Sequence, residues 1–331
     1  MIANLSYQDV KRQSQAVFKQ FGESKWIPYA QDNVNAINQR PTDELKNCGI
    51  GKVLVSVAMG ASLEDKIDAL TKYRERFDLL CCDKAFGVLV ERGITPDFVM
   101  LCDCNIPYDP WLKPYIDKTA GVRLISTPYG NTDWTKKWKG PIYFYANRDA
   151  IESERHFIPI LGENVRTVPA SSNVSNAQVV FMTGMDEWNQ TNFAGYERIY
   201  LVGYDYSWRP DGNYYAFHDP KPKRNYMATR TMLDRNGDIV LTSENLIFSA
   251  RWLTQFVNSW RLPVFNCSGR GIDGMRTADL EQELSRFDIE ASRKIKSFYD
   301  DTNQKRLAFN ESLSTLRRAR EALWHRAIPQ K

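Results

Sequence analysis

Three aspartates that directly follow apolar runs are the residues of this chain best suited to chemistry. Asp83 and Asp103 end two such runs, and Gly203-Tyr-Asp205 ends a third. Carboxylates at strand ends can hold Mg²⁺ or a ribose hydroxyl. The alternative is that each aspartate separately caps a helix. Because three acidic strand ends occur together, we predict a nucleotide site to which Asp83, Gly203 and Asp205 contribute, with Mg²⁺ held by Asp83, Asp103 and Asp205.

Two turns rich in small and hydroxyl-bearing residues offer places for a phosphate. Gly60-Ala-Ser62 follows a predicted strand, and its amides and hydroxyl can open a helix N-terminus toward a phosphate. Ser172 and Asn173 precede a predicted helix and can act in the same way. The alternatives are a plain strand-to-helix turn and ordinary helix capping. We predict that Gly60, Ser62, Ser172 and Asn173 bind the nucleotide.

A long loop after Asp205 carries the remaining candidates. Residues 206–226 are rich in aromatic side chains, among them Tyr215, and include His218, which precedes Asp219. A loop histidine beside an aspartate can act as a general base, although a surface position is the usual place for one. Disordered segments are poor in aromatic residues. We therefore predict a lid over the nucleotide in which Tyr215 donates to a phosphate oxygen, the alternative being a static cover on the sheet edge.

The elements that must position these residues alternate along the chain. Short, nearly all-apolar runs predict buried strands, and apolar residues at helical spacing predict helices between them. This pattern describes an α/β fold, Rossmann-like, with a mostly parallel sheet and helices on both faces. Ligands of such sheets bind beyond the carboxyl ends of the strands. The predicted strands are 53–57, 77–82, 98–102, 122–126, 142–145, 198–202 and 263–265, and the predicted helices are 63–73, 85–91, 173–182 and 243–260.

The two ends of the chain differ in composition from its core. Residues 1–46 are polar and predict an N-terminal helical lead-in, while 47–275 contain the Rossmann-like domain. Residues 276–331 carry mixed charge and predict a C-terminal helical appendage, through which the chain could form a homo-oligomer. The basic run at 316–320 could contact an acidic partner, but a solvated helix face is the favoured explanation.

Composition excludes several classes of protein. With 44 Lys and Arg against 40 Asp and Glu, the net charge of +4 does not imply nucleic acid or an anionic membrane as partner. No apolar run reaches 18 residues, so no membrane span is expected. The first ten residues lack the pattern of a secretory signal, so we expect a cytoplasmic protein. The six cysteines include no C-x-x-C pair, and we expect buried thiols in a reducing compartment. Metal binding by Cys102 and Cys104 would need further ligands.

The order of these residues resembles the domain shared by the motility-accessory-factor flagellin glycosyltransferases and the archaeal 6-hydroxymethyl-dihydropterin pyrophosphokinases. The resemblance covers roughly residues 50–275 and is one of pattern rather than dense identity. It rests on Gly60-Ala-Ser-Leu63, where the family usually has Gly-Pro-Ser-Leu, on Arg92-Gly-Ile-Thr-Pro-Asp97, and on Ile199-Tyr-Leu-Val-Gly-Tyr-Asp205. It continues at 171–174 and 240–243 and at Asn266.

The same stretch is similar to the bacterial CMP-sialic-acid sialyltransferases. Residues 200–206, followed by Tyr214-Tyr-Ala-Phe217, resemble their strand and aromatic loop. In this resemblance Tyr215 matches a tyrosine that contacts the departing nucleotide phosphate. Those enzymes carry a catalytic histidine just before the next helix, where this chain has Thr242-Ser243 instead.

The resemblance implies a nucleotide-utilising transferase, with two competing activities. In a glycosyltransferase with a CMP-sugar-like donor, Ser62, Asn173 and Tyr215 would hold the nucleotide, and His218 or Asp103 would deprotonate a glycan or protein hydroxyl. In a pyrophosphokinase, the three strand-end aspartates would position Mg²⁺ and ATP, and a pterin or modified base would stack on tyrosines. A third interpretation is a non-catalytic nucleotide-binding or assembly module.

Overall fold

The structure is a computed structural model in which the chain divides into two compact units, Met1–Phe287 and Asp288–Lys331. In the second unit most of the described residues are helical, and ion pairs such as Arg293–Glu290 link neighbouring turns. All candidate residues belong to the first unit. The structure describes residues 19, 22–36, 38–147, 166–169, 171, 173–184, 193–209, 212, 214–217, 230–234, 237–269, 273–288, 290–291, 293–294, 296–297, 300–301 and 304–305.

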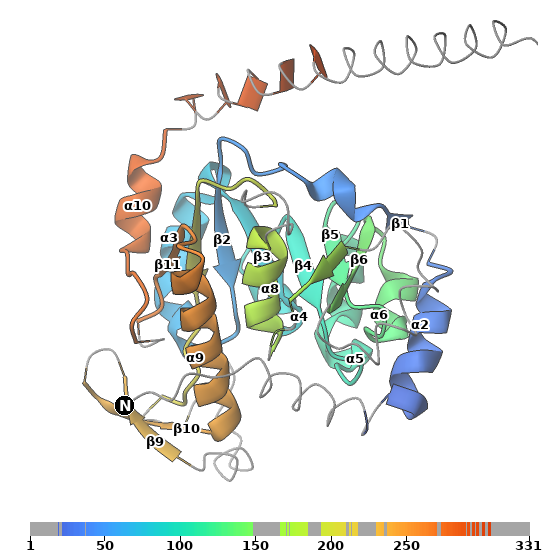
Figure 1. Cartoon of the computed structure of the whole chain (residues 1–331), viewed down its shortest axis with the longest axis horizontal. Helices are drawn as coiled ribbons and strands as arrows, with labels where there is room; N and C mark the ends of the chain where they lie inside the picture. The colour runs from blue at the N-terminus through green and yellow to red at the C-terminus, as the bar shows by residue number, and fades with distance from the viewer. Residues whose placement is uncertain are drawn as a thin grey trace, which may run out of the picture. The chain divides into compact units, whose positions relative to one another are not determined.

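Strands and helices alternate along the first unit, as the apolar periodicity predicts (Figure 1). The strands are β1 (Gln39–Arg40), β2 (Val53–Val57), β3 (Asp78–Cys82), β4 (Phe98–Leu101), β5 (Arg123–Ser126), β6 (Ile142–Asn147), β7 (Arg166–Val168), β8 (Arg198–Val202), β9 (Arg230–Leu233), β10 (Ile239–Thr242) and β11 (Val264–Asn266). The α-helices are α2 (Ile27–Asn33), α3 (Ile67–Lys72), α4 (Asp83–Glu91), α5 (Tyr108–Trp111), α6 (Thr132–Lys137), α8 (Val174–Thr183), α9 (Glu244–Ser259) and α10 (Leu280–Arg286). Shorter turns are the π-helix η1 (Gly22–Trp26) and the 3₁₀-helices η2 (Thr42–Leu45), η3 (Ala61–Lys66), η4 (Arg74–Arg76) and η5 (Lys113–Lys118).

Nine parallel strands form the main sheet, which confirms the predicted fold class. Eight of them follow the order β1-β6-β5-β4-β3-β2-β8-β11, and β7 pairs with β6. All seven predicted strands and all four predicted helices are present within a few residues of their expected bounds. The antiparallel hairpin of β9 and β10 was not predicted, because its exposed positions carry Leu233, Ile239 and Leu241 and so hide the alternation of a half-buried strand.

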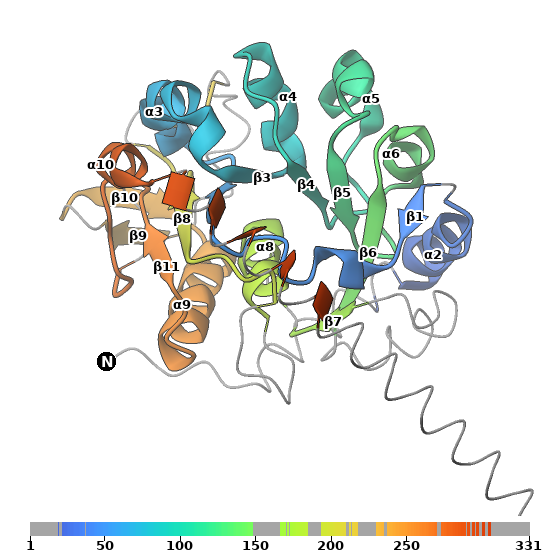
Figure 2. The same ribbon diagram turned by 90° about the horizontal axis from the view of Figure 1, so that it is seen from above.

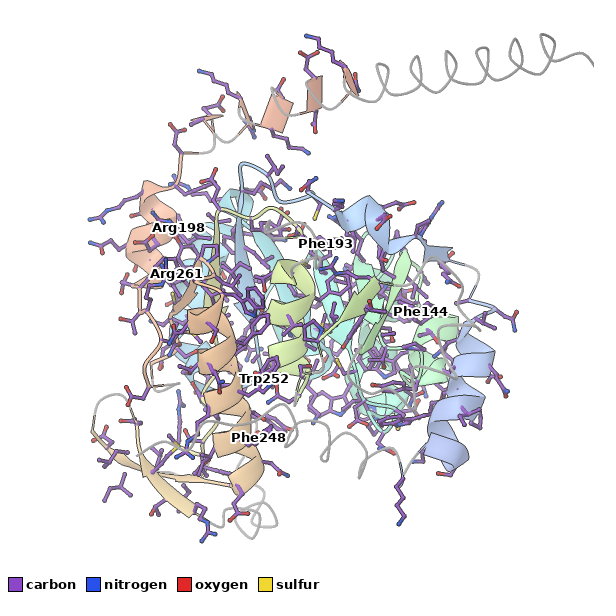
Figure 3. All side chains as sticks on the ribbon, viewed as in Figure 1. Phe144, Phe193, Arg198, Phe248, Trp252 and Arg261 are labelled. Carbon is purple, nitrogen blue, oxygen red and sulfur yellow. The ribbon has the colours of Figure 1, made fainter. Side chains whose placement is uncertain are left out.

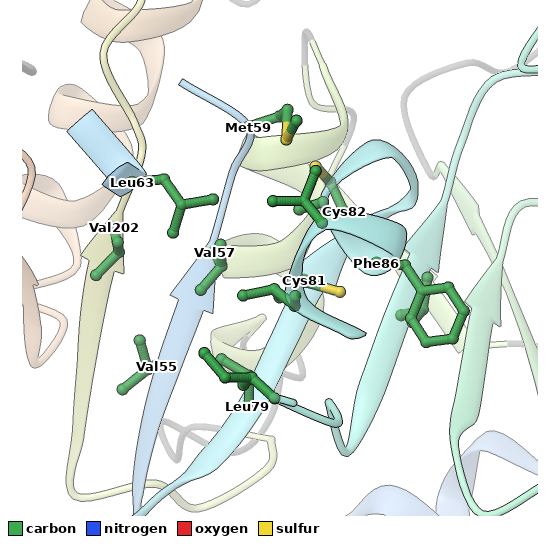
Figure 4. Packing of buried hydrophobic residues seen from close by; sticks show 14 of the residues in the cluster. Val55, Val57, Met59, Leu63, Leu79, Cys81, Cys82, Phe86 and Val202 are labelled. Atoms are coloured by element: carbon green, nitrogen blue, oxygen red, sulfur yellow. The ribbon is translucent and has the colours of Figure 1, made fainter. Parts of the chain in front are cut away.

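The sheet is buried on both faces, and β2 shows how its sequence achieves this. All five residues of β2 are buried, and successive side chains point to opposite faces. Val55 and Val57 pack in the apolar cluster that contains Phe86 of α4 (Figure 4). Leu54 joins the cluster of the opposite face, where Phe193 is also buried (Figure 3). Burial on both faces favours apolar side chains at nearly every position, and the one polar residue of β2, Ser56, has its hydroxyl hydrogen-bonded.

Helices α3 to α6 lie on one face of the sheet, and α8 and α9 lie on the other (Figure 2). Residues 176–183 of α8 are all buried, so this helix is covered on every side and carries no polar stripe. α9 buries only one side, through Leu253 and Val257 among others. Because helices cover both faces of the sheet, polar side chains can reach solvent at the ends of its strands.

The ends of the first unit differ from the predicted boundaries. In the lead-in, α2 is helical as predicted, but β1 adds a strand to the sheet and Leu45 is buried in its core. Of the first 21 residues of this predicted lead-in, only position 19 is among the described residues. The appendage expected at 276–331 is divided, because Leu280 and Leu284 of α10 are fully buried in the core and the boundary follows Phe287.

All six cysteines carry free thiols, as expected. Cys81, Cys82 and Cys104 are buried, and the Cys102 thiol lies 2.8 Å from the Tyr145 hydroxyl oxygen. Among the helices in the described ranges, none has the length and apolar character that a membrane span requires.

The burial of α10 yields a test of its place in the core. Replacing Leu284 by alanine removes a fully buried side chain and should lower the free energy of unfolding by about 2–4 kcal/mol. The matched control is Leu233→Ala, since Leu233 is 63% exposed, and it should change stability by less than about 0.5 kcal/mol. Equal urea-denaturation midpoints for the two variants would contradict this packing.

Candidate functional site

The carboxyl ends of β4, β3, β2 and β8 lie side by side in that order. After β2 the chain continues to β3 on one side, and after β8 it continues to β11 on the opposite side. Where neighbouring parallel strands send their connections in opposite directions, α/β sheets bind their ligands. This position lies between β2 and β8, and it brings Gly60 and Ser62 together with Gly203 and Asp205.

These four residues form a tight joint. The Gly60 amide donates to the Gly203 carbonyl at 2.9 Å, and the Ser62 amide donates to Asp205 Oδ2 at 2.7 Å. The Ser62 hydroxyl donates to Asp205 Oδ1, and both side chains are almost completely buried. Glycine is required at position 60 because a Cβ there would lie 2.4 Å from the Gly203 oxygen. Residues that the sequence assigned to the ends of two strands therefore contact one another at the carboxyl edge.

The contact between Ser62 and Asp205 also limits phosphate binding by the turn after β2. The Asp205 carboxylate takes the place that a phosphate would need against the Ser62 amide. Phosphate binding by Gly60 and Ser62 stays a prediction, and it would require Asp205 to turn away from the Ser62 amide. In the structure these residues hold β2 to β8.

A cation that the sequence analysis missed lies one strand further along. Lys84 Nζ donates to the Tyr215 hydroxyl at 2.7 Å and lies over the rings of Tyr215 and Trp111. Burial alone would lower the pKa of Lys84, but Tyr215 and the adjacent Asp83 raise it above its ordinary value. A lysine in the first turn of a helix opposes the helix dipole. That mismatch was the signal in the sequence.

Asp83 begins α4 and is only 2% exposed. Its Oδ1 accepts from the Lys84 amide at 2.7 Å. Burial, with a smaller contribution from the neighbouring Asp103, raises the pKa of Asp83 to about 6 against the opposing effect of Lys84. A carboxyl group that titrates near neutrality can hold or release a proton in a reaction at physiological pH.

Asp103 is exposed, and its Oδ1 accepts from the Asn105 amide at 2.7 Å. It adjoins Asp83, whereas Asp205 lies two strands away from Asp83, about 10 Å at ~4.8 Å per strand. No group of three His, Cys, Asp or Glu side chains in the described ranges could hold a metal ion. The three aspartates predicted as one metal site therefore separate into the pair Asp83 and Asp103 and the structural carboxylate of Asp205.

The described part of the aromatic loop is bonded across the ends of β2 and η3. Residue 215 forms a bridge to Gly60, and the Phe217 amide donates to Glu64 Oε1 at 2.6 Å. Arg209 pairs with the same Glu64, and the Arg92 guanidinium lies 3.4 Å from the centre of the Phe217 ring. These contacts hold the described part of the loop against the turn after β2 and against η3, and closure of the loop as a lid stays a prediction. His218 lies outside the described residues.

The N-terminus of α8 reaches the same edge on the opposite face of the sheet. Asn173 caps it by accepting from the Asn176 amide at 2.9 Å, which is the capping alternative, and nucleotide binding by Asn173 stays a prediction. Ser172 lies outside the described residues. Beneath it, the Ser56 hydroxyl contacts both the Gln178 amide oxygen at 2.6 Å and the Tyr204 hydroxyl at 2.7 Å. In the sequence, this buried network is marked by Ser56 within the apolar run of β2 and by Gln178 beside the apolar residues of α8.

Thr242 is the residue that the resemblance to the sialyltransferases places at the position of a histidine. Its side chain is fully buried and donates to the Tyr206 carbonyl at 2.7 Å. Thr242 therefore fastens the hairpin to the segment after β8.

A family model described as "6-hydroxymethylpterin diphosphokinase MptE-like" matches residues 30–211, more than half of the chain. A search among curated proteins gives no match. The solved structure of a Maf glycosyltransferase from Magnetospirillum magneticum AMB-1 is similar, at a TM-score of 0.57 and 18% identity over 84% of this chain, which spans 44% of that protein. A mammalian sialyltransferase in complex with Gal-beta-1-3GalNAc-ortho-nitrophenol aligns at a TM-score of 0.40 and 12% identity, over 81% of this chain and 88% of its own.

The raised pKa of Asp83 predicts a specific pH dependence. A carboxyl group whose folded pKa lies near 6 favours the folded state below its unfolded pKa of about 4, and this contribution is lost as pH rises through 6. Asp83→Asn should remove that loss, so the variant gains up to about 3 kcal/mol relative to the parent between pH 4 and 7. Urea unfolding at a series of pH values measures the difference.

The matched control is Asp117→Asn. The hydrogen bond from Lys139 lowers the pKa of the exposed Asp117 carboxyl, so its contribution is present at neutral pH and lost in acid. The relative stability of this variant should therefore change in the opposite direction. A pH-independent difference between Asp83→Asn and the parent would contradict the environment assigned to Asp83.

Proposed function

The chain belongs to the 6-hydroxymethylpterin diphosphokinase MptE-like family, and from this premise we propose that it is a nucleotide-utilising transferase. We further propose that it transfers a sugar from a nucleotide-activated donor, of the CMP-sugar type, to an acceptor hydroxyl. The chain spans less than half of the glycosyltransferase whose fold it shares, so the activity is argued from the residues at the carboxyl edge.

The observation that carries the proposal is the pairing of Lys84 with Tyr215 beside Asp83. When the bond from the anomeric carbon to the donor phosphate breaks, the phosphate oxygen takes the electron pair and gains negative charge. An ammonium group and a hydroxyl donor held in place stabilise that charge. Since the Tyr215 hydroxyl accepts a hydrogen bond from Lys84, it is strengthened as a donor toward a phosphate oxygen.

The acceptor hydroxyl must lose a proton as its oxygen attacks the anomeric carbon. The exposed Asp103 carboxylate adjoins Asp83 and lies on the side of the site away from Tyr215. We assign it the role of general base, with His218 as the second candidate. Asp83 would hold the ribose or a proton near neutral pH. Asn173 at the start of α8 and Gly203 after β8 would line the nucleotide.

A second candidate is a diphosphotransferase acting from ATP onto a pterin, which the family description favours. Mg²⁺ bound to nucleotides takes one or two protein carboxylates and phosphate oxygens. Asp83 and Asp103 fit that requirement, and Mg²⁺ there would neutralise phosphate charge. Asp205 does not fit, because both of its oxygens bind Ser62.

Nucleotide preference separates these functions. We expect CMP to raise the melting temperature of the protein in a thermal-shift series with CMP, UDP, GDP and ATP. Stabilisation by ATP alone would favour the diphosphotransferase. An absence of response to all four would favour a non-catalytic module.

The Lys84 and Tyr215 roles can be tested in the same assay. Lys84→Ala should weaken nucleotide binding about tenfold, because it removes the cation beside the phosphate. The exposed Lys118 provides the control variant Lys118→Ala, which should bind like the parent. Tyr215→Phe should slow nucleotide release from the donor on the order of ten- to a hundredfold while folding normally. Unchanged rates would remove Tyr215 from the mechanism.

Asp103→Asn tests the base. Because Asp103 is exposed, the substitution should leave the unfolding free energy nearly unchanged. Transfer to the acceptor should slow on the order of a hundredfold, since general-base catalysis is lost. Full turnover in this variant would shift the assignment to His218.

A further inference from the structure

One carboxylate beside the site has no role in the proposed transfer, yet it binds the aromatic loop on both sides of Tyr215. Glu64 lies in η3 and is partly exposed. Its Oε2 accepts from Arg209 Nη1 at 2.6 Å, and its Oε1 accepts from the Phe217 amide at 2.6 Å. Arg209 precedes Tyr215 in the chain, and Phe217 follows it. Glu64 therefore links the two parts of the loop that flank the tyrosine.

Arg209 fixes the orientation of this carboxylate. Its Nη2 donates to the Ala61 carbonyl at 2.8 Å and lies 3.6 Å from Asp65 Oδ1. The guanidinium is planar and rigid, so a group that it binds through one nitrogen is held in a fixed direction relative to the other. The Glu64 carboxylate is thus oriented by η3 and Arg209 together, with its Oε1 directed to the Phe217 amide.

Phe217 depends on this hydrogen bond because its backbone is strained. Its φ is 57°, and a bulky residue in the left-handed region persists only where the surrounding contacts hold it. Glu64 binds the Phe217 amide, and the Arg92 guanidinium lies 3.4 Å from the centre of the ring. Without the Glu64 carboxylate, we expect Phe217 to relax to a negative φ, which turns the peptide group that precedes it.

The peptide group between Ala216 and Phe217 is close to the residue that meets Lys84. Ala216 is fully buried, and its amide donates to the Met59 carbonyl at 3.1 Å. The adjacent Tyr215 places its hydroxyl 2.7 Å from Lys84 Nζ. A turn of this peptide group would displace the hydroxyl, and a displacement of about 1 Å can slow a reaction on the order of a hundredfold.

We propose that Glu64 is a positioning residue of the donor site, which holds the Tyr215 hydroxyl in place beside Lys84. This inference rests on the proposed glycosyl transfer. As the donor bond breaks, its electron pair goes to the phosphate oxygen, and the hydroxyl that Glu64 keeps in place donates to that oxygen. Glu64 itself contacts neither donor nor acceptor and acts through the loop. Its loss therefore slows bond cleavage more than it weakens nucleotide binding, because Lys84 stays in place.

Release of CMP from CMP-N-acetylneuraminate by the full chain measures this role without an acceptor. Water then replaces the acceptor: its oxygen bonds to the anomeric carbon, its proton passes to Asp103, and the electron pair of the broken bond leaves with the phosphate. Glu64→Ala should lower kcat about tenfold and keep KM within about threefold of the parent. Glu64→Gln retains an oxygen for the Phe217 amide and should regain most of the loss. The matched control is Glu75→Gln, since Glu75 is exposed on η4, and it should behave like the parent.

A double variant tests whether Glu64 acts through Tyr215. Glu64→Ala combined with Tyr215→Phe should cleave the donor within about twofold of the rate of Tyr215→Phe alone, because the hydroxyl that Glu64 positions is then absent. Losses that multiply in the double variant would show that Glu64 supports the fold only, and they would overturn the positioning role.

Amide hydrogen exchange gives a measurement that does not depend on activity. In Glu64→Ala the amides of Ala216 and Phe217 should exchange about tenfold faster than in the parent, whereas those of β2 should keep their protection. Unchanged protection of Ala216 would overturn the proposal.

The positioning role and the transferase function fail in different ways. If Ala216 loses protection in Glu64→Ala but the parent releases no CMP from the donor, the transferase function is wrong and the positioning of the loop by Glu64 remains. If the parent releases CMP and Glu64→Ala does so at the same rate, the positioning role is wrong and the transferase function remains.

Discussion

The bond between the Asp205 carboxylate and Ser62 is the interaction on which the arrangement of the site depends. It joins the segment after β8 to the turn after β2, at the point where the chain reverses its direction across the sheet. A buried carboxylate is stable only when its oxygens are bonded, and here both are. The joint thus closes the gap between the two halves of the sheet, with Gly60 admitting the backbone approach that a side chain would prevent.

The position of this joint determines where other charges can act. Because Asp205 already places negative charge at the turn, the proposed donor phosphate is assigned to the cation one strand away, Lys84. The aromatic loop brings Tyr215 to that lysine through its bridge to Gly60. One loop therefore contacts the turn after β2 and also places a hydroxyl against Lys84. Asp83, which precedes Lys84, is almost completely buried, and this burial is the main reason that its pKa is raised.

On the face of the sheet that α8 covers, a buried network of neutral hydrogen-bonding side chains lies next to the carboxyl edge. Ser56, Gln178 and Tyr204 satisfy one another across β2, α8 and the segment after β8. Fully satisfied buried networks fix orientation, since an unpaired member would be costly. The capped N-terminus of α8 is thereby held at the carboxyl edge, opposite α4.

The sequence by itself determined the strands, the helices and the parallel sheet, because a strand buried on both faces is a nearly continuous apolar run. It also placed Gly60, Ser62, Asp83, Asp103 and Asp205 at one edge, since parallel strands end together. Only the tertiary structure decided which carboxylate meets which partner. The order of strands is set by long-range pairing, and it put β2 between Asp83 and Asp205 and so divided the predicted metal site. It also brought Lys84 to Tyr215, 131 positions apart in the chain, and burial of α10 depends on the same distant packing.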